Sequence, residues 1–322
     1  MAKTTENLGL LAIYSLNGNN LRMRIEDLRD LFKANSIPAD LFPQITSTQG
    51  AFERATTYAA QTLGKDKLQP IVMREVSNDK ENVIRVFEQR VPYQDDLEKI
   101  NQGGENKPVY KHIATMRYSK KQEAIEFTNA LTPQGQECIS VAQQKYRELN
   151  EFFNIIHIRK MIQDAFKYYN GILFRRNGGV TFIPVDNIKA FQNFAKMCNQ
   201  MDGIELICIN MQMSKDNKTS VLSNLERHVN SSLEDEIKAL GGKTVGNEAL
   251  EELISTFYAE LGNKKISERK LQTLTESFNN TMKLVSEYEK LLDCNLDVMK
   301  SQVSIAQAQL QALLNKELEE DA

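Results

Sequence analysis

The stretch GILFRRNGGVTFIP, residues 171–184, sets the expected fold class of this 322-residue chain because it predicts a β-hairpin. Its Asn177-Gly178 step supplies the positive φ angles that a tight turn between two strands needs. The apolar periodicity that follows predicts a helix over residues 186–201 and then a strand over residues 204–211. That strand is apolar enough to lie centrally in a sheet. Hairpin, helix and strand therefore form one compact α+β unit.

The residues before this hairpin predict an antiparallel body followed by a long helix. Turn residues and short apolar runs alternate there, and all seven prolines lie at or before Pro184. The Thr132-Pro133 step is typical of a helix N-cap followed by a first-turn proline, and it predicts a helix that runs to Tyr169. The other predicted elements are a strand at 8–16, helices at 20–34 and 47–63, and an antiparallel meander at 70–76, 82–91 and 108–118, with a loop at 101–106.

The last third of the chain is predicted to be helical, with helices at 219–240, 247–261 and 267–316. The last of these carries an apolar heptad series in which Glu289 is the one polar member. A helix of this length would extend ~75 Å and would need a partner, either an earlier helix of the same chain or another copy. The side chains expected to drive oligomerisation are Phe278, Val285, Leu292, Leu296, Met299, Val303, Leu310 and Leu313.

The expected fold class is therefore α+β, with a C-terminal rod. An antiparallel-sheet N-terminal body and the hairpin-helix-strand unit are followed by a long helical, coiled-coil-like region. The expected domains are an α+β domain at 1–131, the long helix with the hairpin unit at 132–215, and a helical region at 216–322 that contains the rod at 267–316.

The composition indicates an intracellular protein without a global basic field. Forty basic and 43 acidic side chains give a net charge of −3, which does not favour nucleic acid as a general partner. The four cysteines have no CxxC spacing, which is typical of free thiols in a reducing cell. No stretch approaches the ~20 apolar residues of a membrane span, and the first residues do not resemble a signal peptide. We expect a cytoplasmic protein.

Motifs for catalysis, metals and cofactors are missing from the sequence. The three histidines, His112, His157 and His228, have no partners at metal-ligand spacing, and no GxSxG motif occurs. The sequence LGGKT at 240–244 ends like a phosphate-binding loop, but Ile237 stands where that loop needs its first glycine. We therefore predict no catalytic residue, no metal and no cofactor, and leave open an enzyme whose site is built from dispersed residues.

The predicted hairpin tip is the candidate binding site for nucleic acid or another ligand. Two arginines beside a glycine turn can present guanidinium groups and backbone N–H groups to phosphate. The alternative is a plain hairpin with solvated arginines, because the local excess of positive charge is small. The candidate contact residues are Lys167, Arg175, Arg176, Asn177, Gly178 and Gly179.

Two segments resemble an uncharacterised family encoded mainly by tailed bacteriophages. The first is AFERAT at residues 51–56, and the second is GILFRRNGGVTFIP at 171–184, although Thr181 stands where an aromatic residue is expected. The resemblance covers about residues 45–215. It implies a phage or prophage gene product of unknown activity.

Three functions remain open at this point. The first is a non-enzymatic, self-associating protein that binds a host or phage macromolecule inside the bacterial cell, in host takeover or counter-defence. The second is a nucleic-acid-binding accessory protein of phage DNA metabolism that uses Arg175 and Arg176. The third is an enzyme with a dispersed site. Homo-oligomers and a host or phage protein are the expected partners, nucleic acid is a possible one, and a membrane is not expected.

Overall fold

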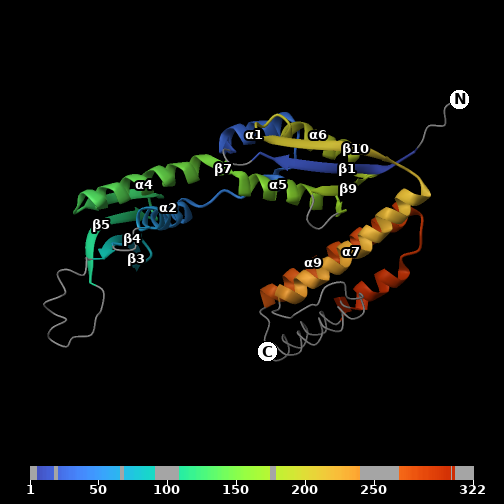
Figure 1. The fold of residues 1–322 in the computed structure, drawn as a ribbon. Helices are drawn as coiled ribbons and strands as arrows, with labels where there is room; N and C mark the ends of the chain where they lie inside the picture. Colours follow the sequence, from blue (N-terminus) through green and yellow to red (C-terminus); the bar gives the residue numbers. More distant parts are fainter. Residues whose placement is uncertain are drawn as a thin grey trace. The chain divides into compact units, whose positions relative to one another are not determined.

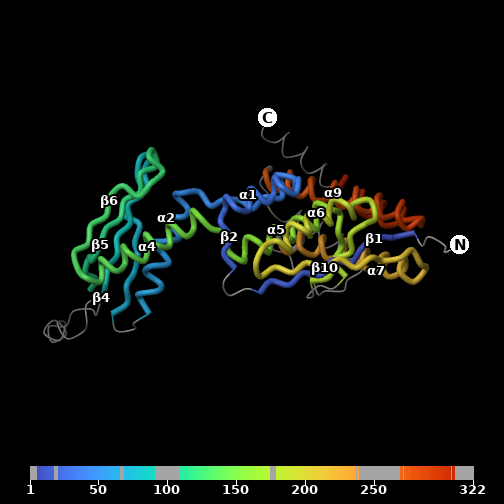
Figure 2. The backbone as a smooth tube through the Cα atoms, turned by 90° about the horizontal axis from the view of Figure 1, so that it is seen from above, coloured from blue at the N-terminus to red at the C-terminus, as the bar shows by residue number. Residues whose placement is uncertain are grey.

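The computed structural model describes residues 6–17, 21–65, 69–90, 109–174, 179–239, 268–305 and 307–308. These residues form an α+β fold with three antiparallel sheets (Figures 1 and 2). They divide into two compact units. Unit 1 lies within residues 1–20, 31–41 and 159–322, and unit 2 lies within 21–30 and 42–158. The domain boundaries expected from the sequence stay a prediction, because compact packing does not measure independent folding.

Unit 2 contains the predicted meander. Its strands β3 (Ile71–Asn78), β4 (Asn82–Arg90), β5 (Tyr110–Ser119) and β6 (Ala124–Ala130) pair in chain order. The three predicted strands are confirmed, and β6 is a fourth strand that the sequence analysis missed. A smaller sheet in the same unit pairs β2 (Arg22–Arg24) with β7 (Phe152–Asn154).

Helices α2 (Thr48–Leu63) and α4 (Pro133–Glu151) pack on the meander. The N-cap predicted at Thr132 is confirmed, because its side chain accepts a hydrogen bond from the Gly135 N–H. Ser47 caps α2 in the same way and accepts from the Gly50 N–H. Gly135 is required at its position, since a Cβ there would lie 2.0 Å from the Ile113 carbonyl oxygen.

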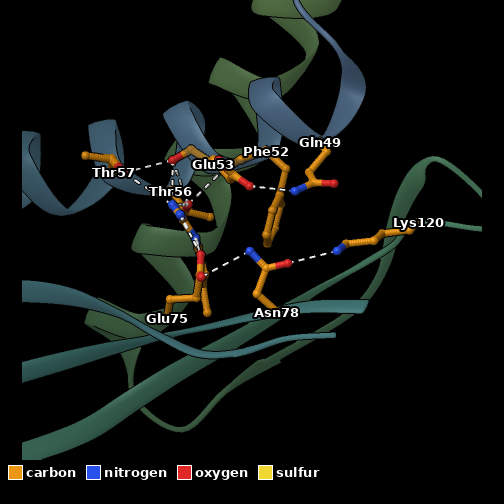
Figure 3. A network of polar contacts seen from close by, with 9 residues as sticks. Gln49, Phe52, Glu53, Thr56, Thr57, Glu75, Asn78 and Lys120 are labelled. Atoms are coloured by element: carbon orange, nitrogen blue, oxygen red, sulfur yellow. Dashed lines mark hydrogen bonds and ion pairs between the residues drawn. The ribbon is translucent and has the colours of Figure 1, made fainter. Parts of the chain in front are cut away.

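A buried arginine ties α2 to the meander. Arg85 of β4 is 8% exposed, and its Nη1 donates to the Glu53 carbonyl at 2.8 Å and to the Thr56 hydroxyl at 3.1 Å. Its Nη2 lies 2.9 Å from Oε2 of Glu75 on β3. Figure 3 shows Glu53, Thr56 and Glu75 converging from the helix and the sheet on this point. The hydrogen bond from Arg85 lowers the pKa of the Glu75 carboxyl.

Unit 1 is built on a sheet with the strand order β10-β1-β9-β8. The strands are β1 (Asn7–Leu16), β8 (Ile172–Leu173), β9 (Val180–Pro184) and β10 (Ile204–Gln212). The predicted hairpin pairing of β8 with β9 is confirmed. The expectation that 204–211 lies centrally is wrong: among the described strands β10 is at an edge, and β1 occupies the inner position between β10 and β9.

Four helices and a shorter helical segment at residues 297–305 belong to the described part of unit 1. Helix α5 (Ile155–Tyr168) continues from unit 2, and α6 (Ile188–Cys198) follows the short η3 turn (Val185–Asn187). Rings of these two helices pack together, with the Phe166 and Phe191 centroids 5.8 Å apart. The other two helices are α7 (Lys215–Ala239) and α9 (Glu268–Leu292). The remaining helical elements are α1 (Ile25–Ala34), which spans both units, and the η1 turn (Ala39–Leu41).

Helices α7 and α9 lie antiparallel and bury a shared core. The start of α7 meets the end of α9, where Lys218 Nζ donates to the Leu292 carbonyl at 2.9 Å. The end of α7 meets the start of α9, where Lys270 Nζ lies 3.8 Å from Glu236 Oε2. Their apolar side chains join Leu8 of β1 and Phe182 of β9 in one cluster. We call this cluster the C-terminal core; its other buried members are Ile172, Val221, Leu225, Val229, Leu233, Leu274, Phe278, Val285, Tyr288, Leu292, Leu296, Met299 and Val303.

The predicted C-terminal rod is wrong. Helix α9 ends at Leu292, Asp293 has a φ of 50°, and helix resumes only at residue 297. Glu289 produces this break by capping the second segment: its Oε1 accepts from the Leu296 N–H at 3.1 Å, and its Oε2 pairs with Lys300. The resumed helix then turns back, so that Gln307 Nε2 donates to Asn279 Oδ1 at 2.6 Å. Residues 309–316 lie outside the described part of the chain.

The continuous helix predicted from Thr132 to Tyr169 is also wrong. Helix α4 stops at Glu151, β7 takes residues 152–154, and α5 starts at Ile155. The Asn154 side chain explains the new start, because its Oδ1 accepts from the Ile156 N–H at 3.0 Å and from the His157 N–H at 3.3 Å. Among the residues that the structure describes, no helix is long and apolar enough to cross a membrane.

Replacing Arg85 with alanine should destabilise unit 2. The change removes the guanidinium that bonds the Thr56 hydroxyl, the Glu53 carbonyl and the Glu75 carboxylate, and it costs about 2 to 3 kcal/mol of unfolding free energy. Hydrogen exchange of the β3, β4 and β5 amides measures this local stability. Arg74→Ala is the matched control, because the Arg74 side chain is 59% exposed in its ion pair with Glu88, and its loss should cost less than about 1 kcal/mol. Equal effects of the two substitutions would show that Arg85 does not anchor α2.

Candidate functional site

The arginine hairpin lies largely outside the described residues. This applies to Arg175, Arg176, Asn177 and Gly178. The two other candidate contacts are placed: the Gly179 carbonyl accepts from the Tyr14 N–H at 3.2 Å, and Lys167 lies in the last turn of α5. Their role in binding nucleic acid stays a prediction.

The predicted oligomerisation residues are placed inside unit 1. Within the described range, Phe278, Val285, Leu292, Leu296, Met299 and Val303 are all members of the C-terminal core, and none is more than 9% exposed. Leu310 and Leu313 lie outside the described residues. One chain therefore buries the described part of this apolar series by itself, and a second copy is not needed to cover that part.

The candidate site is a groove of about 1720 Å³ in unit 1. Its walls are the last turn of α5, the second half of α7 and the middle of α9, with β8 and the η1 turn at its margins. Leu173 and Phe174 line it, which places the chain leading into the arginine hairpin at its edge. We call it the α5–α7–α9 groove.

Hydrogen bonds fix the C-terminus of α5, which forms part of one wall of the groove. Asn170 takes a left-handed conformation, with φ of 55°, and the Gly171 N–H donates to the Phe166 carbonyl at 2.7 Å to end the helix. The Asn170 carbonyl accepts from the Tyr288 hydroxyl at 2.8 Å, and its side-chain amide donates to Glu287. Two neighbouring residues of α9 thereby fix the end of α5.

A second amide completes this wall. Asn187 Nδ2 donates to the Tyr169 carbonyl at 3.0 Å, so another free carbonyl at the end of α5 is satisfied. Tyr288 is fully buried, and burial raises its pKa well above the usual value, so its hydroxyl stays a neutral donor. The groove therefore has a wall whose polar groups are already paired before any ligand arrives.

Most of the side chains that line the groove carry polar groups, and acidic ones outnumber basic ones. Seven carboxylate side chains line it against three permanently basic ones, and most of the rest are amides and hydroxyls. The acidic residues are Asp40, Asp164, Glu234, Asp235, Glu236, Glu276 and Glu287, and the basic ones are Lys167, Arg227 and Lys283. This balance attracts cations and repels phosphate.

His228 is the titratable group of the groove with a shifted pKa. Burial lowers the pKa of His228, and the nearby positive charge of Lys167 lowers it further. The imidazole is therefore held neutral at neutral pH, where it can both donate and accept a hydrogen bond. This histidine is a polar lining group for a ligand rather than an additional positive charge.

The cysteines are poorly suited to nucleophilic chemistry. Burial raises the pKa of the Cys138 thiol to about 11 and raises the pKa of Cys198, Cys208 and Cys294 above the usual value. A thiolate is therefore disfavoured at each of the four positions. Within the described ranges, no group of three or more His, Cys, Asp or Glu side chains could hold a metal ion.

Sequence reasoning missed the groove. Of the two candidate contacts that the structure describes, Lys167 lines the groove and Gly179 does not. The remaining lining residues come from helices far apart in the chain and follow no motif spacing. One usable signal was the Asn170-Gly171 step, because asparagine and glycine favour the left-handed conformation that ends a helix. It marks where α5 stops, but not what faces that end.

Comparison with known protein families gives a match over nearly the whole chain. A family model described as a family of unknown function (DUF6744) matches residues 7–320. No curated protein matches, and no solved structure matches. The match covers both units, so the fold of unit 1 and that of unit 2 occur together in this family.

Acidification should destabilise the protein through His228. The folded state holds its pKa below that of the unfolded chain, so the stabilising effect is present above the unfolded value of about 6.5 and is lost as the pH falls below it. The fall in the thermal midpoint between pH 7 and pH 5.5, followed by circular dichroism, should be smaller in His228→Gln than in the wild type.

The exposed His112 of β5 supplies the control. His112→Gln should keep the full wild-type loss. If His228→Gln and the wild type lose the same amount on acidification, His228 is not held neutral by the fold.

Proposed function

Because the chain belongs to this family of unknown function, we propose its role from the α5–α7–α9 groove: it is a non-enzymatic, self-associating protein that binds a host or phage protein. The partner presents a cationic, hydrogen-bonding segment to the groove. The resemblance of residues 51–56 and 171–184 to tailed-phage proteins supports a phage or prophage origin. Action in the cytoplasm of the bacterial cell, in host takeover or counter-defence, is part of this proposal.

The acidic lining of the groove is the observation that carries the proposal. Carboxylates outnumber permanent cations seven to three, and a volume of about 1720 Å³ exceeds the 300–1,000 Å³ of ordinary small-molecule pockets. A groove of this size with many amides and hydroxyls suits an extended peptide, whose backbone and lysine or arginine side chains supply donors. The paired wall at Asn170 and Asn187 supports binding to a preformed surface, which lowers the entropic cost of association.

The electrostatics of the groove favour a protein partner over nucleic acid. A phosphate backbone brought into the groove would meet the carboxylate of Glu276, together with those of Asp235 and Glu236, which Lys238 and Lys270 balance in part. Each phosphate there would be repelled, whereas nucleic-acid binding needs several lysines or arginines to displace counterions. The alternative role, in phage DNA metabolism through Arg175 and Arg176, therefore depends on the hairpin alone.

Reversing two charges in the groove should abolish most of the binding of a cationic probe. The probe is a short fluorescent peptide of alternating lysine and serine, and its affinity is measured by fluorescence anisotropy at low salt. Asp235 and Glu276 are exposed lining residues on α7 and α9. The double substitution Asp235→Lys with Glu276→Lys should weaken binding by about tenfold or more, because like charges then face the probe.

The matched control makes the same change in net charge away from the groove. Asp202 and Glu226 are exposed and do not line it, so Asp202→Lys with Glu226→Lys should leave most of the affinity. Equal losses in both variants would indicate a general charge effect and contradict a groove site. Tighter binding of an oligonucleotide than of the peptide, with loss in Arg175→Ala plus Arg176→Ala, would favour the nucleic-acid alternative.

A further inference from the structure

Strand β10 has the composition of an inner strand but lies at the edge of its sheet. It pairs with β1 along one side, and no strand of the described residues pairs with its other side (Figure 1). Edge strands normally carry lysine, proline or a bulge that prevents further pairing. Within Ile204–Gln212 there is no lysine and no proline, and the register with β1 is regular from Leu16 to Gly9.

Hydrogen bonds show which backbone groups of β10 point outward. The Leu206 N–H donates to Asn199 Oδ1 at 2.7 Å, and the Leu206 carbonyl accepts from Asn199 Nδ2 at 3.0 Å. These groups therefore point away from β1. Because outward and inward residues alternate along a strand, the backbone groups of Cys208 and Asn210 point outward as well.

The outward edge is capped at both ends, and between the caps no described residue bonds to its backbone. Asn199 caps it at Leu206, and Asn217 Nδ2 donates to the Gln212 carbonyl at 2.7 Å. Leu206 and Gln212 are each three residues from Ile209. The stretch between the two capped residues, residues 207–211, is therefore centred on Ile209. Pairing with an antiparallel copy of the same strand requires such a centre.

Residues 207–211 include two exposed apolar side chains. Ile207 and Ile209 are 45% and 49% exposed, and they lie on the same face of the strand, two residues apart. Antiparallel pairing centred on Ile209 would place it opposite its own symmetry mate and would place Ile207 opposite Met211 of the other copy. Both isoleucines would then gain an apolar neighbour.

We propose that β10 pairs antiparallel with β10 of a second copy of this chain, about a twofold axis at Ile209. Cys208 of each copy then lies opposite Asn210 of the other. Four backbone hydrogen bonds satisfy the outward N–H and carbonyl groups of these residues. The two four-stranded sheets of unit 1 become one continuous sheet. This inference rests on the self-association in the proposed function and names its interface.

Cysteine substitution tests the register directly. In a Cys208→Ser, Cys294→Ser background, Ile209→Cys should form an intermolecular disulfide on mild oxidation. Residue 209 and its symmetry mate would form a non-hydrogen-bonded pair, and the Cα atoms of such a pair are about 4.5 Å apart. Ile207→Cys is the matched control. Its symmetry mate would lie ~14 Å away along the strand, beyond the reach of a disulfide. Equal cross-linking at both positions, or none at 209, would overturn the pairing.

The mass in solution gives a second readout. The wild type should sediment as a dimer, and Ile209→Lys should lower the mass about twofold, because two like charges then face each other at the axis. Mixing Ile209→Lys with Ile209→Asp should restore the dimer. Ile156→Lys, at an isoleucine that is 67% exposed on α5, should remain a dimer.

The outcomes separate this inference from the proposed function. A dimer that persists in Ile209→Lys overturns the β10 interface and leaves self-association standing. A monomeric wild type overturns both the interface and self-association. The lysine–serine peptide, measured on the same samples, reports on the groove independently of either result.

Discussion

The C-terminal core is the packing on which unit 1 depends. It brings Leu8, in the first strand of the chain, together with Leu292 and Val303 near the end of the described residues. Each such side chain contributes about 1.5–3 kcal/mol when it leaves water. The same core positions α9 so that Glu287 and Tyr288 reach Asn170. The wall of the groove therefore exists only because residues at the two ends of the chain pack together.

The parts of the fold that depend on neighbouring residues could be predicted from the sequence. The parts that depend on contacts between distant residues could not. The hairpin, α6, the meander and the cap at Thr132 depend on neighbouring residues, and the structure confirms them. The helix breaks at 152–154 and after Leu292 were missed because an apolar series looks the same in a straight helix and in a helix that folds back. The polar residues Asn154 and Glu289 decide between the two.

The site was far less predictable than the fold. The sequence pointed to Arg175 and Arg176 because they adjoin a recognisable turn, whereas the groove assembles single polar residues from α5, α7 and α9 that have no common spacing. The position of strand β10 was mispredicted for a similar reason. Its apolar sequence predicted an inner position, and only the strand order shows that the described chain leaves it at an edge. Both features become visible only when distant segments are placed beside each other.

Whether the C-terminal core forms within one chain can be measured directly. Light and heavy-isotope chains, mixed in equal amounts, unfolded together and refolded, would be treated with a zero-length carbodiimide cross-linker. Lys270 and Glu236, 3.8 Å apart on α9 and α7, should form an amide. The structure predicts cross-linked peptides of a single isotope only. Mixed-isotope peptides at 236 and 270, formed as often as single-isotope ones, would show that α9 packs on another chain and would contradict this account.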